Sequence, residues 1–135
     1  MAPAKEFRVA LTVADFDQAV AFHHDALGLE QVADWSPESG RVVLLDAGDA
    51  KATLELIDEA SAATIDRIEA GSRVAGPVRL APEVGDSEET AERLVAAGAE
   101  RVAPPASTPW GDRNARVRAP DGMQLTLFLP ESESA

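Results

Sequence analysis

Four polar side chains occupy matching places in two similar halves of this chain, and their types decide which chemistry is open to it. Arg8 and Arg79 stand 71 residues apart, and so do Glu55 and Thr126. Arginine presents only N–H donors, threonine offers a neutral hydroxyl, and glutamate supplies a carboxylate. Buried charges persist when they are paired, so we expect a charge-paired cavity floor in which Glu55 bonds to one or both guanidiniums.

This floor has two uses that the sequence leaves open. The arginines Arg8 and Arg79 either lock Glu55 and close the cavity, or they touch a bound ligand. Glu55 could also transfer protons if burial tunes its pKa, but we expect paired arginines to lower that pKa and weaken the base. Binding is therefore favoured over catalysis.

The four positions fall within a repeated order of predicted elements. Each half starts with a strand, at residues 7–13 and 78–84, and a helix follows with Asp15 or Asp86 as its N-cap. Gly28 and Gly98 end these helices. Three strands then follow in each half, at residues 29–34, 41–46 and 52–57 and at residues 101–103, 115–118 and 124–129. Offsets of 70 or 71 residues between the copies indicate a duplicated unit.

The repeat predicts an α+β fold of two tandem βαβββ modules, at residues 7–59 and 78–130, within a single domain spanning residues 1–135. The linker, residues 60–77, contains a predicted helix that Ser61 caps and Gly71 closes. One module alone would leave an apolar sheet face uncovered, so the two modules should lie side by side around a shared cleft.

Composition excludes several classes of function. The chain has no cysteine, which rules out disulfides, thiolate metal sites and cysteine nucleophiles. A net charge of −12 repels nucleic acid and anionic membranes, although it would attract cationic ligands at long range. No apolar stretch is long enough to span a bilayer and no secretory signal is evident, so we expect a cytoplasmic protein.

Trp35 and Trp110 are the aromatic residues most suited to ligand binding, because each lies next to a turn, where a ring is easily exposed. An indole can stack on a flat ligand or attract a cation, but it can equally cover a sheet edge or a dimer interface. The phenylalanines follow strand or helix patterns and are expected in the core: Phe7, Phe16, Phe22 and Phe128.

The remaining polar residues suggest no catalytic group. His23 and His24 are adjacent on a predicted helix, point about 100° apart and cannot easily share one ion, so we expect them at the surface or partly packed. Arg113, Arg116 and Arg118 alternate with small or apolar residues and are expected on one sheet face.

Prolines and a glycine define two loops near the end of the chain. Pro104, Pro105 and Pro109 should make the loop before Trp110 stiff and unable to pair in a sheet. Residues 120–122, PDG, predict a turn with Gly122 at positive φ.

The repeat, with VALTVADFDQAVAFHHDALGLE near the start and PWGDRNARVRAPDGMQLTLF near the end, resembles the vicinal oxygen chelate superfamily over residues 7–130. That group includes glyoxalase I, bleomycin-resistance proteins and extradiol dioxygenases. The resemblance implies the glyoxalase/bleomycin-resistance fold, a curved mixed sheet, and a homodimer. It also implies a divalent metal, held by a His or similar ligand on the first strand and a Glu on the last strand of each half. The matching positions here are Arg8, Glu55, Arg79 and Thr126.

Those four residues depart from the family pattern. Arginine has no lone pair for a metal and Thr126 offers only a neutral hydroxyl, which leaves Glu55 as the one good ligand. We therefore expect no metal and no other cofactor, and no glyoxalase or dioxygenase chemistry of the usual kind.

The resulting prediction is a metal-independent protein that binds or sequesters a hydrophobic, aromatic or cationic small molecule, similar to antibiotic-resistance and drug-binding members of the family. The predicted ligand-binding residues are Trp35, Trp110, Arg8, Glu55, Arg79 and Thr126, with no catalytic residue among them. The alternative is a lyase, isomerase or dioxygenase-type enzyme of the same superfamily, with a non-standard or metal-free site and Glu55 as base. A purely structural module would instead fill the cavity with side chains.

Overall fold

The computed structural model describes residues 3–26, 29–36, 40–46 and 52–131. Its first module contains, in chain order, β1 (Glu6–Thr12), α1 (Phe16–Val20), a π-helix η1 (Ala21–Ala26), β2 (Glu30–Asp34), β3 (Val42–Asp46) and β4 (Ala52–Ile57). The linker helix is α2 (Glu59–Ala70). The second module contains β5 (Val78–Glu83), α3 (Ser87–Ala96), β6 (Glu100–Arg101), β7 (Ala106–Ser107), β8 (Asp112–Arg118) and β9 (Gln124–Pro130). The α+β fold is confirmed.

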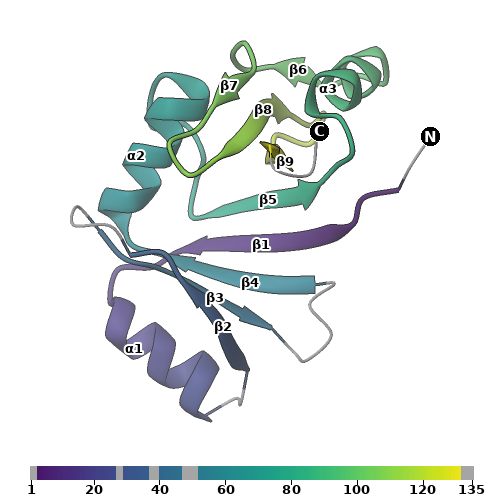
Figure 1. Cartoon of the computed structure of the whole chain (residues 1–135). Helices are drawn as coiled ribbons and strands as arrows, with labels where there is room; N and C mark the ends of the chain where they lie inside the picture. The colour runs from purple at the N-terminus through teal and green to yellow at the C-terminus, as the bar shows by residue number, and fades with distance from the viewer. Residues whose placement is uncertain (1–2, 27–28, 37–39, 47–51, 132–135) are drawn as a thin grey trace.

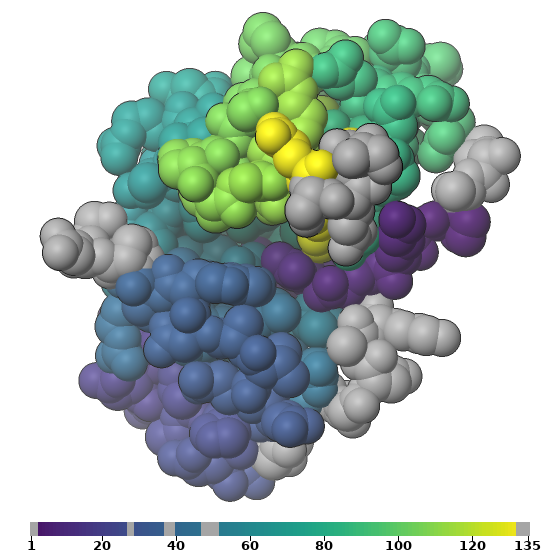
Figure 2. Space-filling model, viewed as in Figure 1, coloured from purple at the N-terminus to yellow at the C-terminus, as the bar shows by residue number. Residues whose placement is uncertain are grey.

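The strands form one mixed sheet whose order is β2-β3-β4-β1-β5-β9-β8-β6, with β7 added beside β8. The modules join where β1 pairs antiparallel with β5, and β1 also pairs parallel with β4. The sheet curls, so that β1 and β5 lie at its centre and the two modules at its ends (Figure 1). In the space-filling view, purple side chains from the start of β1 lie between the blue first module and the green and yellow second module (Figure 2).

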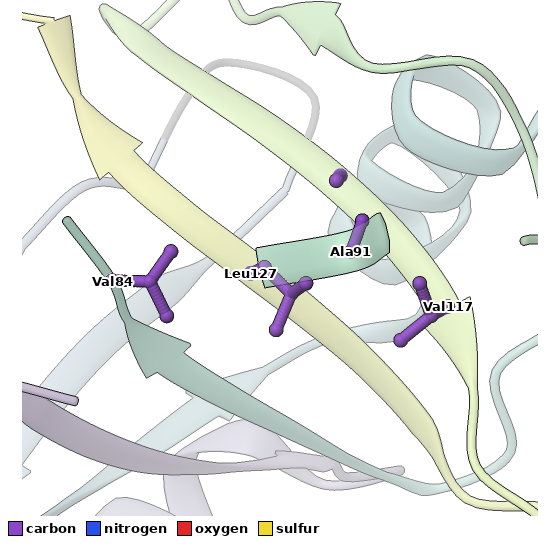
Figure 3. Close-up of a cluster of buried hydrophobic side chains, with 5 residues drawn as sticks. Val84, Ala91, Val117 and Leu127 are labelled. Atoms are coloured by element: carbon purple, nitrogen blue, oxygen red, sulfur yellow. The ribbon is translucent and has the colours of Figure 1, made fainter. Parts of the chain in front are cut away.

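Helices α1 and α3 cover the outer face of the sheet, one on each module. Phe16 of α1 packs in a buried cluster with Val43, Leu45 and Leu56. In the second module, Ala91 of α3 lies against the strand residues Ala115, Val117 and Leu127 (Figure 3). Burying each valine, leucine or phenylalanine side chain of these clusters stabilises the fold by about 1.5–3 kcal/mol.

Helix α2 lies on the opposite face of the sheet, which we call the inner face. Its Ala62 packs with Ala10, Val42 and Ile57, which alternate along their strands with the residues beneath α1. The linker therefore forms part of the packed interior.

The helix ends largely follow the sequence prediction. Asp15 and Asp86 cap α1 and α3 by accepting the N–H of the third residue beyond. Gly71 closes α2 with φ 86°, but the prediction of Ser61 as its N-cap is wrong. Asp58 accepts the N–H of Ser61, because a carboxylate just before the helix satisfies the free N–H groups of its first turn. Gly28 lies outside the described residues.

The predictions for the phenylalanines and for the loop flanked by prolines are wrong in part. Phe7 and Phe22 are exposed, at 41% and 62%. Phe7 alternates with Arg8 along β1 and so lies on the outer face, where neither hydrophobic cluster of that face includes it. Phe16 and Phe128 are buried as expected. The loop flanked by prolines does pair, since β7 retains backbone N–H groups and lies antiparallel to β8. Gly122 has φ 93°, as predicted.

The three arginines of β8 do not share one face, because side chains alternate along a strand. Arg113 lies on the outer face and bonds Glu88 of α3, whereas Arg116 is fully buried on the inner face beneath α2. No helix in the described ranges is long and apolar enough to cross a membrane.

Candidate functional site

The four matched positions all lie on the inner face, near the seam where the modules meet. In the registers of β1, Ala10 is opposite both Glu55 on β4 and Arg79 on β5. Thr126 on β9 is opposite Arg116 on β8. Strand pairing and alternation thus bring residues distant in sequence onto one surface.

Glu55 and Arg79 face one another at the centre of this surface. Both are 7% exposed, and the distance from Glu55 Oε1 to Arg79 Nη2 is 3.8 Å, longer than a hydrogen bond. Burial raises the pKa of Glu55, and the charges of Arg79 and Arg8 offset this only in part. The arginines act in the expected direction, but the expected net lowering of this pKa is wrong, because desolvation of the carboxylate outweighs their attraction.

Thr126 joins Arg79 to the second module. Its Oγ1 accepts from Arg79 Nη1 at 2.9 Å and from Arg116 Nε at 3.2 Å, and it donates to Glu69 Oε1 at 2.6 Å. One hydroxyl donor and two lone pairs are all used. Thr126 is thus held in a single orientation.

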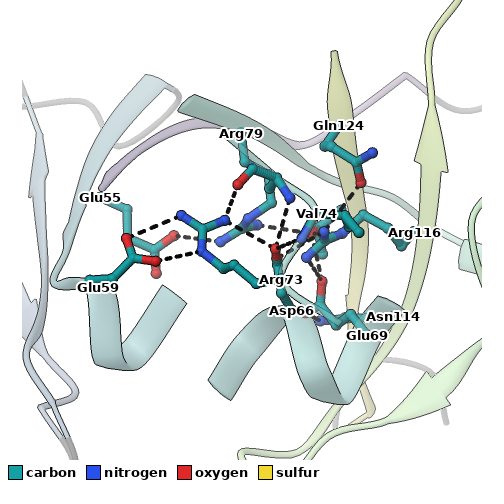
Figure 4. Close-up of polar contacts among 12 residues, drawn as sticks. Glu55, Glu59, Asp66, Glu69, Arg73, Val74, Arg79, Asn114, Arg116 and Gln124 are labelled. Atoms are coloured by element: carbon teal, nitrogen blue, oxygen red, sulfur yellow. Dashed lines mark hydrogen bonds and ion pairs between the residues drawn. The ribbon is translucent and has the colours of Figure 1, made fainter. Parts of the chain in front are cut away.

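Asp66 and Glu69 of α2 supply the carboxylates of a buried network that the sequence prediction missed (Figure 4). Arg116 pairs with Asp66 at 3.0 Å and with Glu69 at 2.9 Å, and Arg73 pairs with Asp66 at 3.1 Å. Burial opposes ionisation of Asp66, but hydrogen bonds from the Ala75 N–H and the charge of Arg116 hold its pKa below the usual value. The spacing of three residues, which puts both acids on one side of α2, was the available signal.

Arg8 has a different partner from the one predicted. Its Nε donates to Glu6 Oε2 at 2.8 Å, and its guanidinium carbon lies 5.2 Å from the ring centre of Trp35 and 4.3 Å from that of Phe128. Glu6 also accepts from Thr53 Oγ1 at 2.9 Å. Arg8 therefore joins the two modules through cation–π contacts, and Glu55 pairs with one guanidinium rather than two.

The two tryptophans are each about half exposed, Trp35 at 48% and Trp110 at 49%. Trp110 Nε1 donates to Asp112 Oδ2 at 3.1 Å. Burial raises the pKa of Asp112, and the Trp110 hydrogen bond and the charge of Arg8 partly oppose this. Trp35 therefore lies against the guanidinium of Arg8, whereas Trp110 is held by the carboxylate of Asp112.

The donor set does not fit the divalent metal that the resemblance implies. Arg8 and Arg79 have no lone pair, and Thr126 uses its oxygen for arginine and Glu69. Among the described residues, no group of three or more His, Cys, Asp or Glu side chains could hold an ion. His24 bonds the Leu29 carbonyl through Nδ1 at 2.7 Å, on the π-helix that follows α1.

Comparison with known proteins agrees with this architecture. The model of the Glyoxalase/Bleomycin resistance protein/Dioxygenase superfamily matches residues 7–127. Methylmalonyl-CoA epimerase from Mycobacterium tuberculosis is 23% identical, with a TM-score of 0.67 over 96% of this chain and 92% of that one. A Streptomyces coelicolor methylmalonyl-CoA epimerase in complex with 2-nitronate-propionyl-CoA is 20% identical, with a TM-score of 0.64 over 94% and 98%. At these identities the likeness shows the fold alone. No curated protein matches the sequence.

Proposed function

The chain belongs to the glyoxalase, bleomycin resistance protein and dioxygenase superfamily, and on that premise we propose that it binds a small molecule at the inner face without a divalent metal. The observation that carries this proposal is the pair of buried charges, Glu55 and Arg79, held 3.8 Å apart rather than locked together. Buried polar groups usually have partners, so the floor retains bonding capacity for a ligand.

Helix α2 fills part of the inner face, which favours a structural role for the Thr126 side of the site. On the side toward Ala10, the packing beneath α2 leaves a small cavity. Arg79, Ala10, Ile57, Ala62 and Ile65 are among the residues that line it. Trp35 is 48% exposed and offers an aromatic surface nearby. The cavity has a volume of about 10 Å³, room for about one water molecule. The half-exposed ring of Trp35 is therefore the feature that supports binding of a partly apolar molecule, including an antibiotic-like one.

Titration of intrinsic fluorescence tests the proposal, because Trp35 and Trp110 are the only tryptophans in the chain. A panel of aromatic and antibiotic-like compounds should shift the emission, and Trp35→Phe should remove more of the shift than Trp110→Phe, since Trp35 contacts Arg8 directly. An unchanged signal across the panel, with no heat of binding by calorimetry, would contradict the proposal.

A second candidate is proton transfer with Glu55 as the base. The raised pKa of Glu55 favours it, because a base whose pKa approaches the working pH is more effective. The similar epimerases make a carbon acid such as methylmalonyl-CoA a reasonable first substrate. Incorporation of solvent deuterium into that thioester, abolished in Glu55→Gln, would support an isomerase. Equal incorporation by the wild type and Glu55→Gln would exclude Glu55 as the base.

We also propose a cytoplasmic homodimer. Exposed Phe7, Phe22 and Val32 supply apolar surface that a second copy could cover. Light scattering of the full chain tests this, and a mass of one chain at high concentration would contradict it.

A further inference from the structure

We infer that the chain has a second binding site, a groove at the end of β1 that takes an ammonium group carried on a compact apolar body. The groove has a volume of about 430 Å³, within the range of pockets that hold small molecules. None of the six residues predicted to bind a ligand is among the described residues that line it. The inference therefore goes beyond the inner-face binding proposed above, and neither depends on the other.

Three segments from different parts of the chain form the groove. Val13 follows β1, Glu59 begins α2, and Pro77 precedes β5. The Thr12 N–H donates to the Pro77 carbonyl at 2.7 Å, and the Val13 N–H donates to the Ile57 carbonyl at 2.9 Å. Backbone hydrogen bonds thus fix these segments relative to one another, so the groove is formed before a ligand binds.

The floor of the groove is apolar and open. Its lining includes the side chains of Val13, Ala14 and Pro77, and Gly76 adds none. Ala14, Gly76 and Pro77 are all exposed. A Cβ added at Gly76 would meet nothing within 4 Å outside its two chain neighbours, so free space lies directly above the backbone there. A small ring or a short alkyl chain can therefore cover this floor and remove it from water.

The charged part of the groove is the ion pair of Glu59 and Arg73 (Figure 4). Arg73 Nε donates to Glu59 Oε1 at 2.9 Å. On its other side, Arg73 Nη1 donates to Asp66 Oδ2 at 3.1 Å and to the Ala75 carbonyl. The positive charge of Arg73 therefore has a second, buried counter-charge in Asp66 and does not depend on Glu59 alone.

Glu59 has acceptor capacity left for a further donor. Its side chain is 67% exposed, and an ionised carboxylate has about four lone-pair sites, of which Arg73 takes two. An ammonium group brings a positive charge and N–H donors, which match these acceptors. An anion would instead meet the negative charge of Glu59, and the net charge of −12 attracts cations at long range. The groove therefore favours amines over acids.

Nuclear magnetic resonance of the isotopically labelled full chain tests the site and its selectivity together. Benzylamine, benzyl alcohol and benzoate share one ring and differ in the charge of the head group. Benzylamine should shift the backbone amide signals of Val13, Ala14 and Gly76. We expect it to bind about fivefold more tightly than the alcohol, the upper end of what an exposed ion pair contributes, and benzoate to bind more weakly than either. The indole N–H signals of Trp35 and Trp110 report on the inner face separately.

Two pairs of variants assign the binding to the groove. Gly76→Leu places a side chain in the open space and should abolish the shifts, whereas Gly85→Leu, which also has open space around it but lies just before α3, should bind like the wild type. Glu59→Gln should remove the preference for the amine over the alcohol. Glu88→Gln is its control, since Glu88 is likewise exposed, at 54%, and pairs with Arg113 at 2.8 Å. Circular dichroism establishes that each variant is folded.

Each outcome decides the inference. Shifts of the groove amides that Gly76→Leu removes and Gly85→Leu keeps, with a preference for the amine that Glu59→Gln alone abolishes, would support it. Shifts confined to the indole signals would place the amine at the inner face and overturn the second site, as would the absence of any shift at millimolar concentration. Equal binding of the three ligands, tighter binding of benzoate, or an equal effect of Glu59→Gln and Glu88→Gln would overturn the selectivity for ammonium.

Discussion

Replacing Glu69 by alanine is expected to destabilise the fold strongly, because this carboxylate bonds three groups inside the protein. It is 3% exposed and accepts from Thr126 at 2.6 Å, Arg116 at 2.9 Å and Asn114 at 2.9 Å. Arg116 is fully buried and would keep only Asp66 as an anionic partner. Removing one partner of a buried ion pair costs about 3–5 kcal/mol.

Glu88→Ala provides the matched control, since Glu88 also pairs with an arginine of β8. Its contact with Arg113 is 2.8 Å, but the side chain is 54% exposed. Surface ion pairs contribute about 0–1 kcal/mol, so the same substitution should have little effect there. The closest contacts in the two pairs, 2.9 Å and 2.8 Å, are similar, so the test compares a buried carboxylate with three partners against an exposed one with a single arginine partner.

Urea unfolding, followed by circular dichroism, measures both free energies. With a slope of about 2 kcal/mol per M, Glu69→Ala should lower the midpoint by about 1.5–2.5 M and Glu88→Ala by less than about 0.5 M. The double variant Glu69→Leu/Arg116→Met should recover much of the loss, because it leaves fewer unpaired charges. A midpoint for Glu69→Ala equal to that of Glu88→Ala would refute the reasoning.

Three further outcomes are expected. Glu55→Gln should gain stability relative to the wild type as pH rises from 5 to 8. The pKa of Glu55 is raised in the folded protein, so the wild type loses stability as this carboxyl group deprotonates. Thermal melts that show the opposite trend would contradict this. Gly40→Ala should cost about 1–3 kcal/mol, since its Cβ would lie 2.1 Å from Ser61 Oγ, while Gly76→Ala, with open space around it, should cost nothing measurable by urea unfolding. Arg8→Met should cost about 1–2 kcal/mol through two lost cation–π contacts, again by urea unfolding, and an unchanged midpoint would show that these contacts contribute little.

The repeat in the sequence was sufficient to place Glu55, Arg79 and Thr126 on one surface. Residues at equal offsets in duplicated strands share a face, because strand alternation is the same in both copies. The caps Asp15 and Asp86 could also be predicted from the sequence, because capping is a local interaction. The bounds of the modules themselves stay a sequence prediction.

Other features depend on contacts that no local pattern contains. Asp66 and Glu69 could be assigned to one side of a helix, but whether that side met solvent or Arg116 depended on how the linker packs. The pKa of Glu55 depends on both its burial and the charges near it. The sequence identifies the charged residues but does not show how deeply Glu55 is buried. The partner of Arg8, by contrast, could have been predicted from the sequence. Glu6 lies two residues away on the same strand, and strand alternation puts both side chains on one face.

Helix α2 has a consequence for how the chain can be divided. Its first half packs Ala62 against strands of the first module, and its second half gives Asp66 and Glu69 to the second. A fragment starting at Val78 would contain all the strands of the second module, β5 to β9, and still leave Arg116 without the carboxylates of Asp66 and Glu69. The two halves repeat one sequence pattern, but each depends on contacts with α2 for its stability. Fragments of the chain should therefore fold only when they are combined and one of them contains α2.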